Sequence, residues 1–355
     1  MPDRSTMRSL RYVGPRRLEW HEVPTPILLG PGEAIVEPVA ASVCDIDRPV
    51  IAGETPFPGP FAIGHEGVAL VAEVGDAVTS VVPGQLVAVA WHIACGTCRQ
   101  CLVGHTANCE SVPAQAMFGL PAGGDWGGMF DERVRVPFAD AMLTPLPSGM
   151  DAITAVSAGD NLSLGYEIMR KHIPQGRRRV AVLGWQAVGL YQVAFAKALG
   201  AEDILYVDDD PGHRALAEAY GARAVTGPPS REHGTFDLVV DASFQEAWLR
   251  RGIRMLEPEG VAECLGGYFG DVAVPAFAMC RTGVTLRLGR ANTGPHVAPT
   301  LDAITSGDID PLVIQDGTFA WDDAATVLVE PGLKPVFTKH LTTTTNHPLL
   351  KETTP

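Results

Sequence analysis

The chain has 355 residues, of which 46% are hydrophobic and 19% charged, and its formal net charge is −14. This length exceeds one ordinary core and predicts two domains. The acidity, without any run of lysine or arginine, argues against a nucleic-acid partner. There is no N-terminal apolar core of signal-peptide length and no apolar stretch of about 18 uncharged residues, so we expect no membrane association and a cytoplasmic location.

Short runs of β-forming residues recur through roughly the first 150 residues. They lie at 32–41, 67–75, 85–91 and 132–137. Turn-forming segments such as Val82-Pro83-Gly84 separate them. This pattern predicts an irregular β-rich domain.

Four cysteines follow these first strands in one short segment, at Cys95, Cys98, Cys101 and Cys109. Without an export signal we expect a reducing compartment, where close cysteine clusters bind metal more often than they form disulfides. Their short spacings let one loop wrap four thiolates around a tetrahedral zinc ion and leave no open position. A structural zinc site is the prediction; an iron–sulfur cluster or unbound thiols are the alternatives.

The pattern changes near Asp151, a candidate N-cap for a helix over 151–172. Continuous apolar strands then alternate with amphipathic helices, which predicts a parallel sheet covered on both faces. The strands are 178–184, 203–208, 236–242, 260–267 and 285–290, and helices are expected at 188–200 and 213–222. Two further helices are expected at 299–311 and 319–331, and a disordered tail at 342–355.

The first strand of this region runs into a partial G-x-G-x-x-G pattern, with Gly184 and Gly189 as its first and third glycines. Gln186 replaces the middle glycine, and Val188 immediately precedes the last one. Two glycines alone are a weak signal. An acid at the end of the next strand, Asp208, strengthens it, because such an acid accepts hydrogen bonds from the adenosine ribose.

Two further acids, Asp209 and Asp210, follow Asp208 directly. A 2′-phosphate at this place would face three carboxylates, which favours NAD over NADP. The alternative is a turn that is acidic for no functional reason.

These features together resemble the zinc-dependent medium-chain dehydrogenase/reductase superfamily, which includes alcohol and polyol dehydrogenases. The resemblance rests on the four-cysteine loop, Gly64-His65-Glu66-Gly67, the 184–189 segment and Asp208. It implies an α/β fold, with a GroES-like β-rich catalytic domain and a Rossmann doubly wound parallel-sheet domain. The expected boundaries are 1–155, 156–290 and a return to the catalytic domain over 291–355. A homodimer or homotetramer is also implied.

By the same resemblance, Cys44, His65 and Asp160 are ligands of a second, catalytic zinc. A thiolate, an imidazole and a carboxylate leave one position open for a substrate oxygen. Asp47 resembles the acid that orients the histidine ligand. Glu66 resembles an acid just behind the metal, with transient coordination as an alternative.

The chain departs from the family where a proton relay is expected. Ile46 stands at the relay hydroxyl position, and Pro49 lies near the position of a relay histidine in some members. An aliphatic side chain cannot carry the hydroxyl proton away. Three accounts stay open: another acceptor (Asp45, Glu66, His92 or water), a reaction that reduces a carbonyl, enal or iminium, or loss of catalysis.

The leading hypothesis is an NAD- and zinc-dependent dehydrogenase acting on a small-molecule alcohol such as a polyol, sugar or cyclitol. A polar pocket of Asp45, Arg48, His92 and Asn161 would suit such a substrate, although Asp45 and Arg48 alternatively pair on the surface. A reductase of a conjugated carbonyl or iminium, and a non-catalytic NAD-binding scaffold, are the competing hypotheses.

Overall fold

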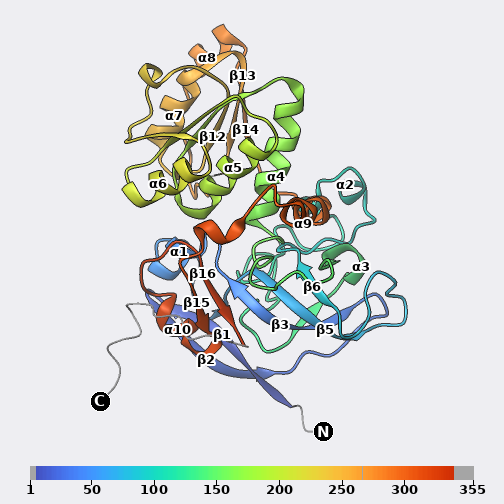
Figure 1. The fold of residues 1–355 in the computed structure, drawn as a ribbon. Helices are drawn as coiled ribbons and strands as arrows, with labels where there is room; N and C mark the ends of the chain where they lie inside the picture. Colours follow the sequence, from blue (N-terminus) through green and yellow to red (C-terminus); the bar gives the residue numbers. More distant parts are fainter. Residues whose placement is uncertain (1–4, 266, 340–355) are drawn as a thin grey trace. The chain divides into compact units, whose positions relative to one another are not determined.

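The structure, a computed structural model, describes residues 5–265 and 267–339 (Figure 1). The chain divides into two compact units. Unit 1 comprises the described residues of Met1–Asp160, Thr293–Asp302 and Gln315–Pro355, and unit 2 comprises those of Asn161–Asn292 and Ala303–Ile314. Unit 1 is β-rich and unit 2 carries a parallel sheet, which confirms the predicted fold class. The tail predicted to be disordered lies outside the described residues.

Unit 1 contains a seven-stranded and a three-stranded sheet. The larger sheet has the order β15 (Gly317–Ala320), β16 (Pro335–Thr338), β3 (Ala34–Ser42), β5 (Glu66–Val74), β6 (Leu86–Val89) and β8 (Leu143–Pro145), with β7 (Val134–Val136) also paired to β3. The smaller sheet has the order β2 (Arg17–Pro24), β1 (Thr6–Gly14) and β4 (Phe61–Ala62).

The antiparallel pair β3 and β5 positions the predicted ligands of unit 1. Their register sets Ser42, the last residue of β3, opposite Glu66, the first residue of β5. Cys44 follows β3 by two residues and His65 directly precedes β5, so the register brings both to the same end of the pair. Both strands are largely buried, and their pairing contains two irregularities, between Ile35 and Val36 and between Pro38 and Ala40.

Unit 2 is built on a six-stranded sheet whose paired strands are all parallel. Its order is β11 (Arg223–Val225), β10 (Asp203–Val207), β9 (Arg179–Leu183), β12 (Phe236–Asp241), β13 (Leu256–Cys264) and β14 (Thr285–Leu288). Helices α5 (Gln186–Ala198) and α7 (Glu246–Met255) pack on it. The strand order reverses between β9 and β12, and such switch points form ligand crevices at the carboxyl ends of the strands.

The helix predicted from Asp151 begins ten residues later, as α4 (Asn161–His172). Asp151 accepts a hydrogen bond from the Ile153 amide (3.1 Å) and so closes a local turn instead of capping a helix. Residues 152–160 continue as turns. A methyl group on Gly159 would collide with the carbonyl oxygen of Val89, so this turn packs directly on the end of β6.

The C-terminal helices are also shorter than predicted. The first is α9 (Val297–Ser306) followed by a 3-10 turn, and the second is only α10 (Ala324–Val327). Strand β15 takes residues 317–320, because they pair in register with β16. Over the described residues, no helix combines the length and apolarity that a membrane span needs.

One buried carboxyl group of unit 1 makes stability depend on pH. Burial raises the pKa of Asp131 to about 7, although the Gly128 amide donates to its Oδ2 (3.0 Å). Unfolded, this group titrates near pKa 3.9, so the folded chain binds more protons between about pH 4 and 7. Stability from this group is therefore full at low pH and falls as pH rises through that window.

We expect Asp131→Asn to gain stability over the wild type progressively from about pH 4 to 7 and to keep the gain above it, with an upper limit of about 4 kcal/mol. Asparagine carries no charge and keeps an oxygen for the Gly128 amide. Denaturant unfolding at several pH values measures the difference. Asp140→Asn is the control: bonds from Ser80 and Thr79 outweigh burial and lower the pKa of Asp140 to about 2, so this variant should be less stable throughout. A pH-independent effect of Asp131→Asn would contradict the account.

Candidate active site and metal centres

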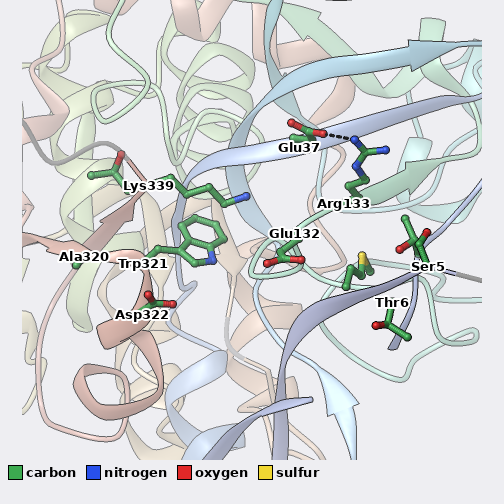
Figure 2. Close-up of a pocket in the computed structure, with 12 residues that line it drawn as sticks. Ser5, Thr6, Glu37, Glu132, Arg133, Ala320, Trp321, Asp322 and Lys339 are labelled. Atoms are coloured by element: carbon green, nitrogen blue, oxygen red, sulfur yellow. Dashed lines mark ion pairs between the residues drawn. The ribbon is translucent and has the colours of Figure 1, made fainter. Parts of the chain in front are cut away.

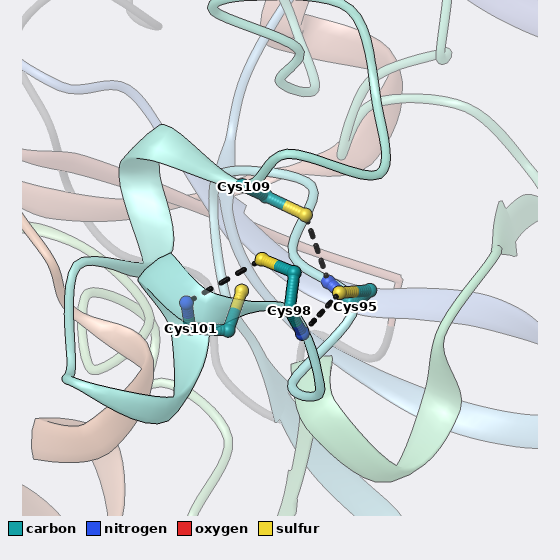
Figure 3. A group of neighbouring side chains, drawn as sticks. All are labelled: Cys95, Cys98, Cys101 and Cys109. Carbon is teal, nitrogen blue, oxygen red and sulfur yellow. Dashed lines mark hydrogen bonds between the residues drawn. The ribbon is translucent and has the colours of Figure 1, made fainter.

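The four predicted zinc cysteines converge in unit 1, as Figure 3 shows. One sulfur from each of Cys95, Cys98, Cys101 and Cys109 lies within 4.8 Å of the others. Cys98 caps the short helix α2 (Arg99–Leu102), which carries Cys101 toward the group. Four thiol donors at this spacing match a closed tetrahedral zinc site.

Backbone amides around the loop point at these sulfurs. Cys95 Sγ accepts from the amides of Thr97 (3.4 Å) and Cys98 (3.3 Å), and from the Ser111 hydroxyl (3.2 Å). Burial opposes ionisation, but these donors outweigh it and lower the pKa of Cys95 to about 5. Burial raises the pKa of Cys101 and Cys109, so a fully ionised set needs a bound cation.

A second group of donor atoms comprises Cys44, His65 and Asp160, again within 4.8 Å of one another. Cys44 comes from the turn between β3 and α1 (Asp47–Ala52), His65 from the start of β5, and Asp160 from the turn before α4. The structure thus brings together all three residues predicted as ligands of a catalytic metal. Three donors in a tetrahedral site leave one position for another ligand.

The electrostatics of this group favour a cation. Burial raises the pKa of the Cys44 thiol well above its usual range, and Asp160, Glu66 and Asp45 raise it further. Burial alone would lower the pKa of His65, but Asp47 and Asp160 outweigh it and raise the pKa to about 9. Negative charge is therefore in excess here.

One oxygen of the group has no hydrogen bond. Asp160 Oδ2 is buried without a donor and lies 3.5 Å from His65 Nε2. A buried polar atom left unpaired costs about 1–3 kcal/mol. A thiolate, an imidazole and this carboxylate oxygen are donors that zinc binds, so the residues fit the metal.

Asp47 sits behind the group, fully buried. Its Oδ2 accepts from the Cys44 amide (3.0 Å), which fixes the turn that presents the thiol. Its Oδ1 lies 3.7 Å from His65 Nδ1, within ion-pair range but longer than a hydrogen bond. Its predicted bond to the histidine ring is therefore not formed at this distance.

Glu66 has a partner that the sequence did not reveal. Its Oε2 pairs with Lys334 Nζ (2.6 Å) and accepts from the Ser157 hydroxyl (2.6 Å), while its Oε1 makes no hydrogen bond. Burial raises the pKa of Glu66 to about 7, and Lys334 opposes the rise. A lone lysine directly before the apolar strand β16 was the available signal for Lys334.

Two of the four residues predicted to form a polar pocket, Arg48 and His92, make hydrogen-bond contacts with other parts of unit 1. Arg48 donates to the carbonyl oxygens of Leu328 (3.3 Å) and Glu330 (3.1 Å). His92 is fully buried, with its Nε2 2.8 Å from the Thr106 hydroxyl. The third pocket residue, Asp45, is also buried (3% exposed). The fourth, Asn161, belongs to unit 2 and is not placed relative to the others.

The dinucleotide segment of unit 2 follows β9. A methyl group on Gly189 would collide with the carbonyl oxygen of Gly184, so the helix packs on the strand end as the glycine pattern requires. Val188 is buried on α5. Gln186 begins this helix in the left-handed region (φ 50°), and its buried Oε1 makes no hydrogen bond. The tight turn and the close packing at Gly189 fit a dinucleotide-binding segment.

Asp208 directly follows β10, as predicted. Its Oδ2 accepts from the Tyr206 hydroxyl (2.8 Å) and lies 3.1 Å from His213 Nδ1, and its Oδ1 accepts from the Asp210 amide (2.9 Å). A carboxylate oxygen can accept two bonds, so Oδ1 retains capacity for a ribose hydroxyl. Arg214 donates to the backbone oxygen of Asp208 (2.8 Å). The contacts of His213 and Arg214 with Asp208 were not predicted from the sequence.

The two acids after Asp208 have local roles. Asp210 caps α6 (Pro211–Ala219), accepting from the amides of Gly212 (2.7 Å) and His213 (3.0 Å). Asp209 accepts from the Gly227 amide (3.1 Å). The acidic run is therefore a strand end, a loop contact and a helix cap.

Unit 1 also carries a groove of about 960 Å³ (Figure 2). None of the predicted site residues lines it. Its charged groups are largely paired: Arg133 lies 2.7 Å from Glu37, and the Lys339 ammonium lies over the Trp321 ring (4.7 Å). Size alone therefore does not make this groove the active site.

A β-rich unit with a four-cysteine site and a Cys-His-Asp group, in a chain with a doubly wound parallel sheet, defines the class of zinc-containing dehydrogenases. Residues 30–148 match the alcohol dehydrogenase GroES-like domain family. A probable zinc-binding alcohol dehydrogenase of Mycobacterium tuberculosis is 31% identical over 330 residues, covering 90% of this chain and 84% of that protein. An alcohol dehydrogenase of Cupriavidus necator is 29% identical, covering 77% and 80%.

Solved structures of alcohol dehydrogenases share this fold. An alcohol dehydrogenase from Thermus sp. ATN1 superposes with a TM-score of 0.85 at 28% identity, covering 94% of this chain and 99% of that one. The chain belongs to the zinc-dependent medium-chain dehydrogenase/reductase superfamily. It is an oxidoreductase of the zinc-type alcohol dehydrogenase kind.

Proposed function

We propose that the protein oxidises a secondary alcohol bearing further hydroxyl groups, such as a polyol, sugar or cyclitol, with NAD as hydride acceptor. The observation that carries this proposal is the group of Cys44, His65 and Asp160, with three donors and room for a fourth ligand. These residues would hold a catalytic zinc, and the four-cysteine loop a structural one. Zinc so bound supplies a Lewis acid for the substrate oxygen.

Residues around the three ligands fix their positions and shape the site. Asp47 fixes the Cys44 turn through its amide bond, and the Trp91 ring lies 6.0 Å from the His65 ring as an apolar wall. Ile46 has no proton to pass. Glu66 is the candidate acceptor for the hydroxyl proton, through its Oε1. Burial raises the pKa of Glu66 to about 7, and a general base is most effective when its pKa lies near the ambient pH.

A hydroxylated substrate is favoured by one buried carboxylate. Asp45, directly after Cys44, is 3% exposed and influences the pKa of the thiol. A carboxylate can accept up to about four hydrogen bonds, so an acid beside the site can receive a second substrate hydroxyl in addition to its contacts within the chain.

We expect NAD-linked turnover to be highest with polyhydroxylated secondary alcohols in a panel that includes simple alcohols, sugars and cyclitols. Absorbance of the reduced nicotinamide is the measurement. Cys44→Ser should lose one of two zinc ions and keep its fold. Replacing a residue that contacts a metal ligand lowers activity about 10–100-fold, and we expect the loss of a ligand itself to lower kcat/KM by more than that. Cys280→Ser, an exposed cysteine on α8 (Ala276–Thr282), is the control.

Unchanged turnover in Cys44→Ser would refute the assigned site. Activity only with enals or iminium substrates would favour the reductase alternative, to which the aliphatic Ile46 gives some support.

NAD is favoured over NADP because of Asp208. Its buried carboxylate has capacity for a ribose hydroxyl and would repel a 2′-phosphate. A hydrogen bond to a charged group contributes about 1.5–3 kcal/mol of free energy, which corresponds to about 10–100-fold in cofactor specificity.

We expect Asp208→Ala to lower the NAD/NADP ratio of kcat/KM by about 10–100-fold. Removing the carboxylate also leaves His213 and Arg214 to meet a phosphate. Steady-state kinetics with both cofactors measures the ratio, and Asp209→Asn, which keeps an acceptor for Gly227, should leave it unchanged. An equal effect of both substitutions would show that bulk acidity, not Asp208, sets the preference.

We also propose that the protein is a homodimer or homotetramer. Strand β14 pairs with β13 and forms an end of the described sheet, and Leu288 on it is 53% exposed. Helix α8, which precedes β14 in the chain and contacts β13, carries Phe277, which is 78% exposed. An edge strand with apolar neighbours is a surface for pairing with a second copy.

Light scattering should give a molar mass of two or four chains, and Leu288→Glu should shift it toward one chain by placing a charge at the edge. Leu102→Glu, at a leucine of unit 1 that is even more exposed (73%), is the control. A monomeric wild type would refute the proposal.

A further inference from the structure

Lys334 is a fully buried lysine whose contacts lead directly to the Cys-His-Asp group. Its Nζ donates to the carbonyl oxygen of Val43 (2.8 Å) and pairs with Glu66 Oε2 (2.6 Å). Val43 precedes Cys44, and Glu66 follows His65. One ammonium group therefore ties together the two segments that present these ligands. Lysine is almost never fully buried unless it is paired in this way.

The two oxygens of Glu66 are held unequally. Lys334 and the Ser157 hydroxyl both act on Oε2, each at 2.6 Å, whereas buried Oε1 makes no hydrogen bond. Glu66 directly follows His65, and the lysine that holds it also binds the residue before Cys44, so its carboxylate lies next to the group. Glu66 nevertheless stands outside the group of donor atoms within 4.8 Å of one another.

We propose that Lys334 is a positioning residue that holds Glu66 outside the coordination sphere of the catalytic zinc and so keeps the fourth position open for substrate. The inference rests on the proposed catalytic zinc. Its physical basis is that zinc accepts carboxylate oxygen readily and is satisfied by four ligands. A nearby carboxylate released from its cation would become the fourth ligand and compete with the substrate oxygen.

Replacing Lys334 tests the proposal through the metal itself. Lys334→Met removes the ammonium, and Lys334→Gln removes its charge but keeps a donor for Val43 in case the methionine variant does not fold. In the double variant Glu66→Gln/Lys334→Met the freed side chain is a poor zinc ligand. Lys171→Met is the matched control, because Lys171 also pairs with a buried glutamate, Glu263 (3.0 Å), in unit 2.

Each protein is produced with cobalt in place of zinc, and its visible ligand-field spectrum is recorded during titration with imidazole, a probe for an open coordination position. We expect the wild type and the Lys171→Met control to respond. The cobalt forms of the Lys334 single variants should show an altered spectrum and an imidazole response weakened at least about tenfold, the scale of effects from outer contacts of metal sites. The same variants produced with zinc should release it to a chelator more slowly than the zinc-loaded wild type. The double variant should regain the response.

A merely structural lysine predicts a different result. Lys334 variants that lose metal faster than the wild type, or that bind imidazole as the wild type does, would overturn the proposal. A double variant as unresponsive as Lys334→Met would do the same. A wild type that holds one metal per chain and never responds to imidazole would instead refute the proposed catalytic zinc, so the two failures are distinguishable.

Discussion

Buried negative charge at one end of the β3–β5 pair is the constraint on which the site depends. The carboxyl groups of Asp45, Asp47, Glu66 and Asp160 are all buried there, beside the thiol of Cys44. Taking an ion out of water costs several kcal/mol in real proteins unless a partner compensates it. Lys334 compensates part of this charge from within the chain, and the Arg48 guanidinium, near Asp45 and Asp47, compensates more. The remaining excess is what a divalent cation would balance, and three donors already converge to bind one.

The same constraint explains why the ligands come from turns at strand and helix ends. Metal donors must meet within a few ångströms, and the antiparallel register of β3 and β5 delivers Cys44 and His65 to one place. Asp160 reaches them from a turn that only glycine at position 159 lets pack against Val89. The sheet thus supplies rigidity, and the turns supply the reactive groups.

The sequence predicted the parts of the site that depend on local spacing or on a family motif. The four-cysteine loop is readable because one short segment provides all its ligands, and Cys44, His65 and Asp160 because each lies in a motif that resembles the family. The role of Lys334 was not predictable, since a lone lysine before an apolar strand does not indicate which carboxylate it pairs with. The roles of His213 and Arg214 likewise depend on the path of α6 past Asp208.

The fold shows the same limit. Alternating strands and helices predicted the parallel sheet of unit 2, because burial on both faces leaves a strong apolar pattern. The helix from Asp151 was wrong over its first ten residues, because a side-chain bond to the Ile153 amide and tight packing at Gly159 override helix propensity there. Asp210 was interpreted through its charge, whereas its geometry is that of a helix cap.

Anomalous X-ray scattering at the zinc absorption edge, from crystals of protein never exposed to chelators, tests the central claim most directly. The account predicts one peak enclosed by the four cysteine sulfurs and a second bounded by Cys44 Sγ, a His65 ring nitrogen and an Asp160 oxygen. A peak at the cysteines alone, with Cys44, His65 and Asp160 as close together as they are here, would contradict it.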